Sequence, residues 1–154
     1  MAMTITLWIL VFGFSLGAAA FDVRTRHIPN AWNLGGLAIF LLWHAWTGTL
    51  WVSVLGAVAV GTIWLIPALL GWSGVGDMKM AAALGAALGA VPGILVTGIG
   101  FWWLVAPGVR RLAYGLGPGT LEAERARGIP VAVGFCLGVI TLGSVWLLMA
   151  RFLG

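Results

Sequence analysis

The sequence predicts an all-α, polytopic membrane protein with six transmembrane helices and both termini outside. Of its 154 residues, 62% are apolar and only 8% are charged, whereas about 25% of the residues of a soluble domain carry a charge. The few charges divide the chain into long uncharged runs, and the basic residues gather on one side of the predicted bundle. A soluble globular protein is therefore excluded, and the chain reads as a single transmembrane domain over 1–154.

The uncharged runs at the two ends of the chain each have the length of one span. About 20 helical residues cross a hydrocarbon core about 30 Å thick, which fits runs 1–21 and 128–150. The segment 1–8 has no Lys or Arg, so the first run lacks the positive region of a signal peptide. We therefore expect one membrane helix at each end.

The two inner runs are too long for one straight crossing each. Run 28–76 would extend about 73 Å as a helix, so we expect two helices with a break at 47–49. Run 80–109 would extend about 45 Å, and Pro92-Gly93 near its middle favours a hairpin of two short helices. The predicted helices are 4–21, 30–46, 50–70, 78–91, 93–109 and 129–150.

The basic residues predict the orientation of these helices. Six crossings put the loops at 22–29, 71–77 and 110–128 on one face, and only Arg151 on the other. By the positive-inside rule the first face is cytoplasmic. A single crossing over 80–109 would remove this bias and is rejected. The basic residues on the cytoplasmic face are Arg24, Arg26, Lys79, Arg110, Arg111, Arg125 and Arg127.

The composition also limits the chemistry. The one cysteine, Cys136, excludes an intramolecular disulfide and a multi-cysteine metal site, so we expect no metal and no cofactor. The net charge of +4 is explained by membrane orientation, and we expect no nucleic acid partner. Gly85, Gly89 and Gly93 form a small-residue seam that favours close helix packing, with a substrate groove as the alternative.

Two aspartates are the best candidates for chemistry. Asp22 ends the first predicted helix and Asp77 begins the fourth, so both come to the cytoplasmic side at similar depth. Two carboxyl groups held close tend to share one proton. The ionised one can then activate a water while the protonated one polarises a carbonyl, as in aspartic proteases. The structural alternative is that each pairs with a nearby basic residue, Arg24 or Lys79, or sits at a helix end for its dipole.

Two motifs around these aspartates are similar to a known family. The chain reads DVRTRHIPN from Asp22 to Asn30 and GVGDMK from Gly74 to Lys79. This pair of motifs resembles the type IV prepilin peptidases, which are polytopic GxGD aspartic proteases. The chain looks most like the short CpaA/TadV-type members, which process Flp-type prepilins. The stretch 128–134 is similar to a third, weaker feature of the family.

The resemblance implies that Asp22 and Asp77 are the catalytic pair. Gly74 and Gly76 would let the backbone approach Asp77 and the substrate closely. Lys79 would either tune the pair and contact substrate or only anchor the topology.

Other residues of the first motif are expected to support it. Arg24 and Arg26 are more typical of orientation signals than of catalytic groups. Pro29 and Asn30 would form the turn and cap that start the second helix. His27 is expected to be an interfacial residue rather than a base.

The resemblance further implies an inner-membrane endopeptidase that cuts a leader from a prepilin-like precursor at the cytoplasmic face. The precursor would have its own apolar helix in the lipid, and a pilus or type II secretion-like assembly machinery would be a partner. We expect no N-methyltransferase or zinc-motif domain. Three alternatives stay open: a small transporter or channel subunit whose aspartates bind cations or protons, an assembly scaffold, and a GxGD protease with another substrate.

Overall fold

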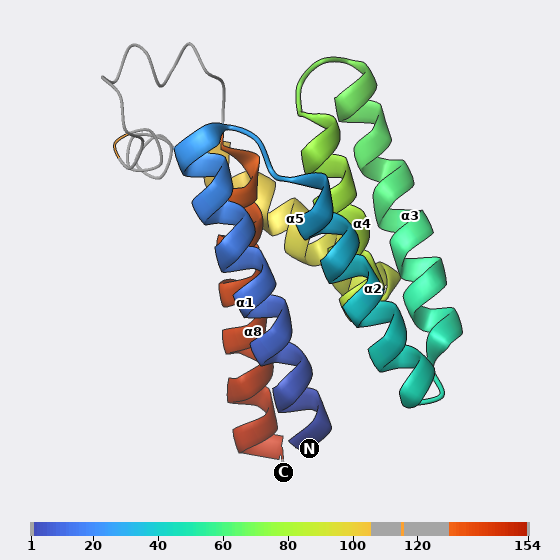
Figure 1. Cartoon of the computed structure of the whole chain (residues 1–154). Coiled ribbons are helices and arrows are strands. Elements are labelled where there is room, and N and C mark those ends of the chain that lie inside the picture. The colour runs from blue at the N-terminus through green and yellow to red at the C-terminus, as the bar shows by residue number, and fades with distance from the viewer. Residues whose placement is uncertain (1, 106–114, 116–129, 154) are drawn as a thin grey trace.

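The chain folds as an all-helical bundle in the computed structural model (Figure 1), which describes residues 2–105, 115 and 130–153. This confirms the all-α class. Apart from residue 115, the predicted cytoplasmic loop at 110–128, with its four arginines and two glutamates, lies outside the described residues, as does the end of the helix predicted at 93–109. The described helices are α1 (Ala2–Thr25), α2 (Asn30–Trp46), α3 (Leu50–Leu69), α4 (Val75–Leu88), α5 (Ala90–Val105) and α8 (Val131–Leu153).

Three described helices, α1, α3 and α8, are long and apolar enough to cross a membrane. α5 is apolar but shorter, and α2 and α4 have 17 and 14 residues. Both termini lie at one end of the bundle, while the α1–α2 and α3–α4 connections lie at the other (Figure 1). This arrangement is compatible with six crossings, although the number of spans and the external location of the termini stay predictions.

The helices that carry the two aspartates are longer on the aspartate side than predicted. α1 continues to Thr25 rather than ending at 21, and it stops where Arg26 takes a left-handed conformation with φ of 54°. α4 begins at Val75 rather than 78. The Asp22 carboxyl therefore projects from the last turn of α1, and the Asp77 carboxyl from the first turn of α4.

The predicted hairpin near Pro92-Gly93 is in the wrong place. The chain turns at Gly89, which has φ of 84° and ends α4, a backbone conformation that glycine adopts without steric cost. Pro92 lies instead in the first turn of α5, where its missing N–H has no helical partner to lose.

The glycine seam is a packing surface within the bundle. A Cβ at Gly85 would overlap the Gly56 carbonyl oxygen of α3, and one at Gly93 would come within 2.9 Å of the Gly85 Cα. The backbones of α3, α4 and α5 therefore touch where these glycines face one another, which is how membrane helices approach closely. This supports the packing interpretation of the seam over the substrate groove.

The middle of the bundle is closed by large apolar side chains. Met80 and Leu84 of α4 are fully buried, and Trp64 of α3 meets Phe135 of α8 edge to face with ring centroids 4.6 Å apart. α4 lies at the centre, in contact with α2, α3 and α5. The first turn of α4 is consequently held on several sides.

Candidate functional site

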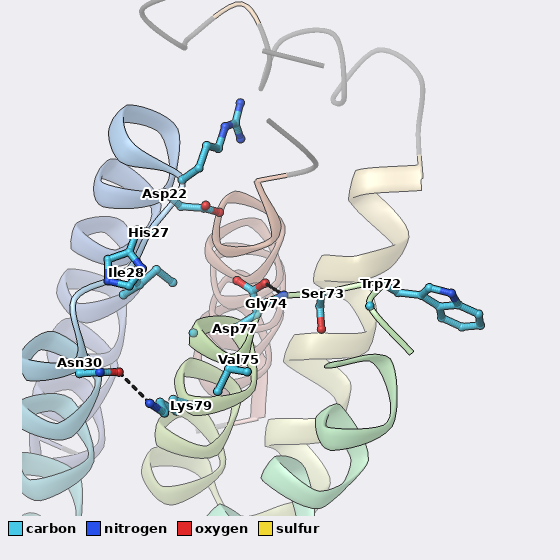
Figure 2. A pocket seen from close by; sticks show the side chains of 13 residues that line it. Asp22, His27, Ile28, Asn30, Trp72, Ser73, Gly74, Val75, Asp77 and Lys79 are labelled. Atoms are coloured by element: carbon cyan, nitrogen blue, oxygen red, sulfur yellow. Dashed lines mark hydrogen bonds between the residues drawn. The ribbon is translucent and has the colours of Figure 1, made fainter. Parts of the chain in front are cut away.

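A polar cavity opens at the end of the bundle where α1 and α3 end and α2 and α4 begin. Its volume is about 570 Å³. Figure 2 shows the side chains of this cavity, with the carboxyl groups of Asp22 and Asp77 directed toward the same region between α1 and α4. Two segments distant in sequence thus supply one site. The lining residues are Asp22, Arg26, His27, Ile28, Asn30, Gly71, Trp72, Ser73, Gly74, Val75, Gly76, Asp77 and Lys79.

Asp22 is held by the start of the last helix. Its side chain is buried, with 6% of its surface exposed, and its Oδ2 accepts a hydrogen bond of 3.0 Å from the Ala132 N–H. Ala132 is the second residue of α8, where amide groups have no partner within the helix. The positive end of α8 therefore faces the Asp22 carboxyl and favours a negative charge on it.

Asp77 is held by its own helix start. Its Oδ2 accepts a hydrogen bond of 2.8 Å from the Gly74 N–H (Figure 2), which is the bond that the third helical residue makes back to the N-cap amide in a capping box. Asp77 is thus the helix-end residue that the structural alternative expected, and it lines the cavity as well. The fold uses one carboxyl oxygen to fix the side chain at the cavity wall.

The two carboxyl groups interact electrostatically. Repulsion from Asp22 acts on Asp77, and the Asp22 side chain is buried while that of Asp77 is half-buried. Because a low dielectric strengthens repulsion between like charges, a negative charge on one carboxyl group makes ionisation of the other more costly.

Lys79 and Asn30 form the opposite wall of the cavity. The Lys79 ammonium donates a hydrogen bond of 2.7 Å to Asn30 Oδ1 (Figure 2). Pro29 precedes the first residue of α2, as expected, but the expectation that Asn30 caps this helix is wrong: the start of α2 has no side-chain cap. The Asn30 side chain reaches across to α4 instead, so it joins the two motifs.

The two arginines of the first motif lie in different surroundings. Arg26 lines the cavity with Asp22 and His27. Arg24 is exposed and lines an apolar groove between α1 and α8. Of the two, Arg26 alone is positioned near the carboxyl pair, and Arg24 has the exposure expected of an orientation signal.

The two glycines of the second motif adopt backbone conformations open to other residues. Gly74 has φ of −80°, and a Cβ on Gly76 would come no closer than 3.9 Å to its nearest neighbour, Ile28. The described residues therefore leave room for a methyl group at Gly76. Any need for glycine there would come from a substrate.

Sequence reasoning missed two contacts that hold the segments carrying the aspartates. One is the Ala132 amide, which carries no side-chain signal at all. The other is Asn33, whose Nδ2 donates a hydrogen bond of 3.1 Å to the Gly76 carbonyl. An amide side chain inside a predicted membrane helix is a detectable signal, because polar groups within membrane helices are costly and often functional.

The described residues contain no cluster of three His, Cys, Asp or Glu that could hold a metal ion. In comparisons with known proteins, a family model described as the type IV leader peptidase family matches residues 5–109. No curated protein and no solved structure matches the chain. The matched segment contains both sequence motifs and every described residue that lines the cavity.

Proposed function

The chain belongs to the type IV leader peptidase family, and on this premise we propose that it is an aspartic endopeptidase with Asp22 and Asp77 as the catalytic pair. The observation that supports the assignment is that both carboxyl groups line one polar cavity although they are 55 positions apart in sequence. The alternative of a transporter or channel subunit is not favoured, because the matching family consists of peptidases.

The proposed reaction needs only the two carboxyl groups and water. The ionised aspartate takes a proton from a water molecule, whose oxygen attacks the scissile carbonyl. The protonated aspartate hydrogen-bonds the carbonyl oxygen and stabilises the charge that develops on it. The first aspartate then gives the proton it took from water to the amide nitrogen, the C–N bond breaks and the amine leaves. The Ala132 and Gly74 amides keep the two side chains in place during this exchange. Carboxyl pairs of this kind bring the proton donor and acceptor together without a metal.

The proposed substrate is a type IV, Flp-like prepilin with an N-terminal leader and an apolar helix. A cut at this cavity would fall near the end of the bundle, where a substrate helix leaves the lipid. We place this end at the cytoplasmic face of the inner membrane, because the basic residues Arg24, Arg26 and Lys79 lie there. We further propose that the chain works beside the pilus assembly machinery and cleaves without methylating the product.

The test is to coexpress the protein with a candidate prepilin and to follow loss of the leader on a gel. We expect Asp22→Asn and Asp77→Asn each to lower the processing rate by about 100-fold or more, as loss of a general acid or base does. His27→Gln is the matched control, because His27 lines the same cavity without a role in the proposed reaction. Full processing by either aspartate variant would refute the catalytic assignment.

A further inference from the structure

We propose that Asn33 is a positioning residue for the reaction: its amide holds the Gly76–Asp77 segment of α4 against α2 and so fixes the distance between the two carboxyl groups. This inference rests on the proposed function. Asn33 lies outside the cavity lining and touches no reacting group, so its effect would pass through the backbone next to Asp77.

The geometry of α2 and α4 supports this role. Two buried polar side chains of α2 donate hydrogen bonds to α4 carbonyls, Asn33 to Gly76 at 3.1 Å and His44 to Ala87 at 3.0 Å. Each pair is separated by 43 positions, so the two helices run in the same direction and in register. The two contacts lie 11 residues apart along each helix, which is about three turns. α4 is therefore tied to α2 near both of its ends.

The Ala87 and Gly76 carbonyls differ in whether α4 itself supplies a hydrogen-bond partner. Ala87 lies in the last turn of α4, where a carbonyl has no partner within the helix, so His44 satisfies a group that would otherwise be buried and unpaired. Gly76 lies in the first turn, where the regular partner of its carbonyl is the amide four residues later. The hydrogen bond from Asn33 is thus a second one for the Gly76 carbonyl. Its effect is to fix the position of the first turn of α4.

The carbonyl oxygen of the Asn33 amide, Oδ1, argues against a purely stabilising role. Asn33 is 2% exposed, and its Oδ1 has no hydrogen-bond partner among the described residues. An unpaired buried carbonyl costs folding free energy. An apolar residue of similar shape would avoid this cost. The residue is therefore poorly suited to stability alone, and the bond to the residue before Asp77 gives the amide a use.

The experiment measures leader processing by Asn33→Leu, with the amount of folded enzyme set by thermal unfolding in detergent. We expect kcat to fall by about 10- to 100-fold, because a displacement of about 1 Å in a reacting group has effects of this size. KM should stay within about twofold, since Asn33 does not line the cavity. The midpoint of unfolding should equal or exceed that of the wild type.

The matched control is His44→Leu, which breaks the other contact between the same helices. It should lower the midpoint of unfolding and leave kcat per folded molecule unchanged. A wild-type kcat in Asn33→Leu, a change confined to KM, or a loss of kcat matched by instability would each overturn the proposal. If Asn33→Leu does not accumulate, Asn33→Ala is judged by the same criteria. Processing by Asp77→Asn, or none by the wild type, would instead refute the proposed function.

Discussion

The two ends of α4 use polar groups in opposite ways. At its start, Asp77 and Lys79 face a cavity of about 570 Å³. At its other end, the Ala86 carbonyl accepts a hydrogen bond from Ser53 and the Ala87 carbonyl accepts one from His44. A polar group whose partners lie within the fold maintains that fold. A polar group that faces open volume remains available to a substrate.

The hydrogen bonds at the Ala86–Ala87 end of α4, which we call its closed end, also explain why the backbone can turn inside the bundle. The end at Asp77 is its open end. The His44 ring donates through Nε2, because a carbonyl only accepts, and its Nδ1 lies 2.7 Å from the Thr49 hydroxyl oxygen. The carbonyls exposed by the turn at Gly89 thus find partners on α2 and α3. Buried peptide groups without such partners would cost about 1–3 kcal/mol each.

The largest effect is expected within the packed half of α4. Gly85→Ala would place a methyl group onto the Gly56 carbonyl oxygen, a backbone atom that cannot move aside. We expect a loss of about 3 kcal/mol or more of stability, at the upper end of overpacking effects, measured as the free energy of unfolding in detergent. A variant as stable as the wild type would show that the α3–α4 contact is looser than described.

At the open end, the length of the acidic side chain should matter as well as its charge. Asp77→Glu and Asp22→Glu each keep a carboxyl group but move it by one methylene. We expect the processing rate to fall by about 100-fold, equivalent to about 2.7 kcal/mol, with little change in unfolding temperature. Rates near that of the wild type in both variants would contradict a geometrically defined pair.

Ser53→Ala tests the closed end separately. The change removes the donor to the Ala86 carbonyl, whose bond with Ser53 is 2.7 Å long and buried. We expect stability to fall by about 1–3 kcal/mol, while processing per folded molecule stays at the wild-type rate. A selective loss of processing in this variant would mean that the two ends of α4 are coupled.

The smallest expected effect is a gain at the open end. Gly76 is helical, and a Cβ there would make only ordinary contact with Ile28 at 3.9 Å. Because alanine loses less conformational freedom than glycine in a helix, Gly76→Ala should add about 0.5–1 kcal/mol of stability. A destabilised variant would show that the turn is more crowded than described. A stable variant that processes slowly would show that the substrate needs the space that a Cβ on residue 76 fills.

How far the sequence predicts the molecule depends on the kind of signal. The all-α class and the candidate aspartates follow from local features, namely apolar runs and acids at their edges. The break at Gly89 was predicted three residues too late, because a proline signals the start of a helix as readily as a turn. The Ala132 amide and the depth of Asn33 depend on which helices become neighbours, which hydrophobicity alone does not encode.

The 14 residues of α4 amount to a rod about 21 Å long, against a hydrocarbon slab of about 30 Å. Such a hydrophobic mismatch is relieved by thinning the bilayer. The carbonyls of Ala86 and Ala87 are paired within the protein, whereas the end at Asp77 opens into the polar cavity, so we expect a thinned bilayer to bring water to the side of Asp77. Hydrolysis would then occur in a hydrated depression below the headgroups, within reach of a peptide still partly embedded in lipid.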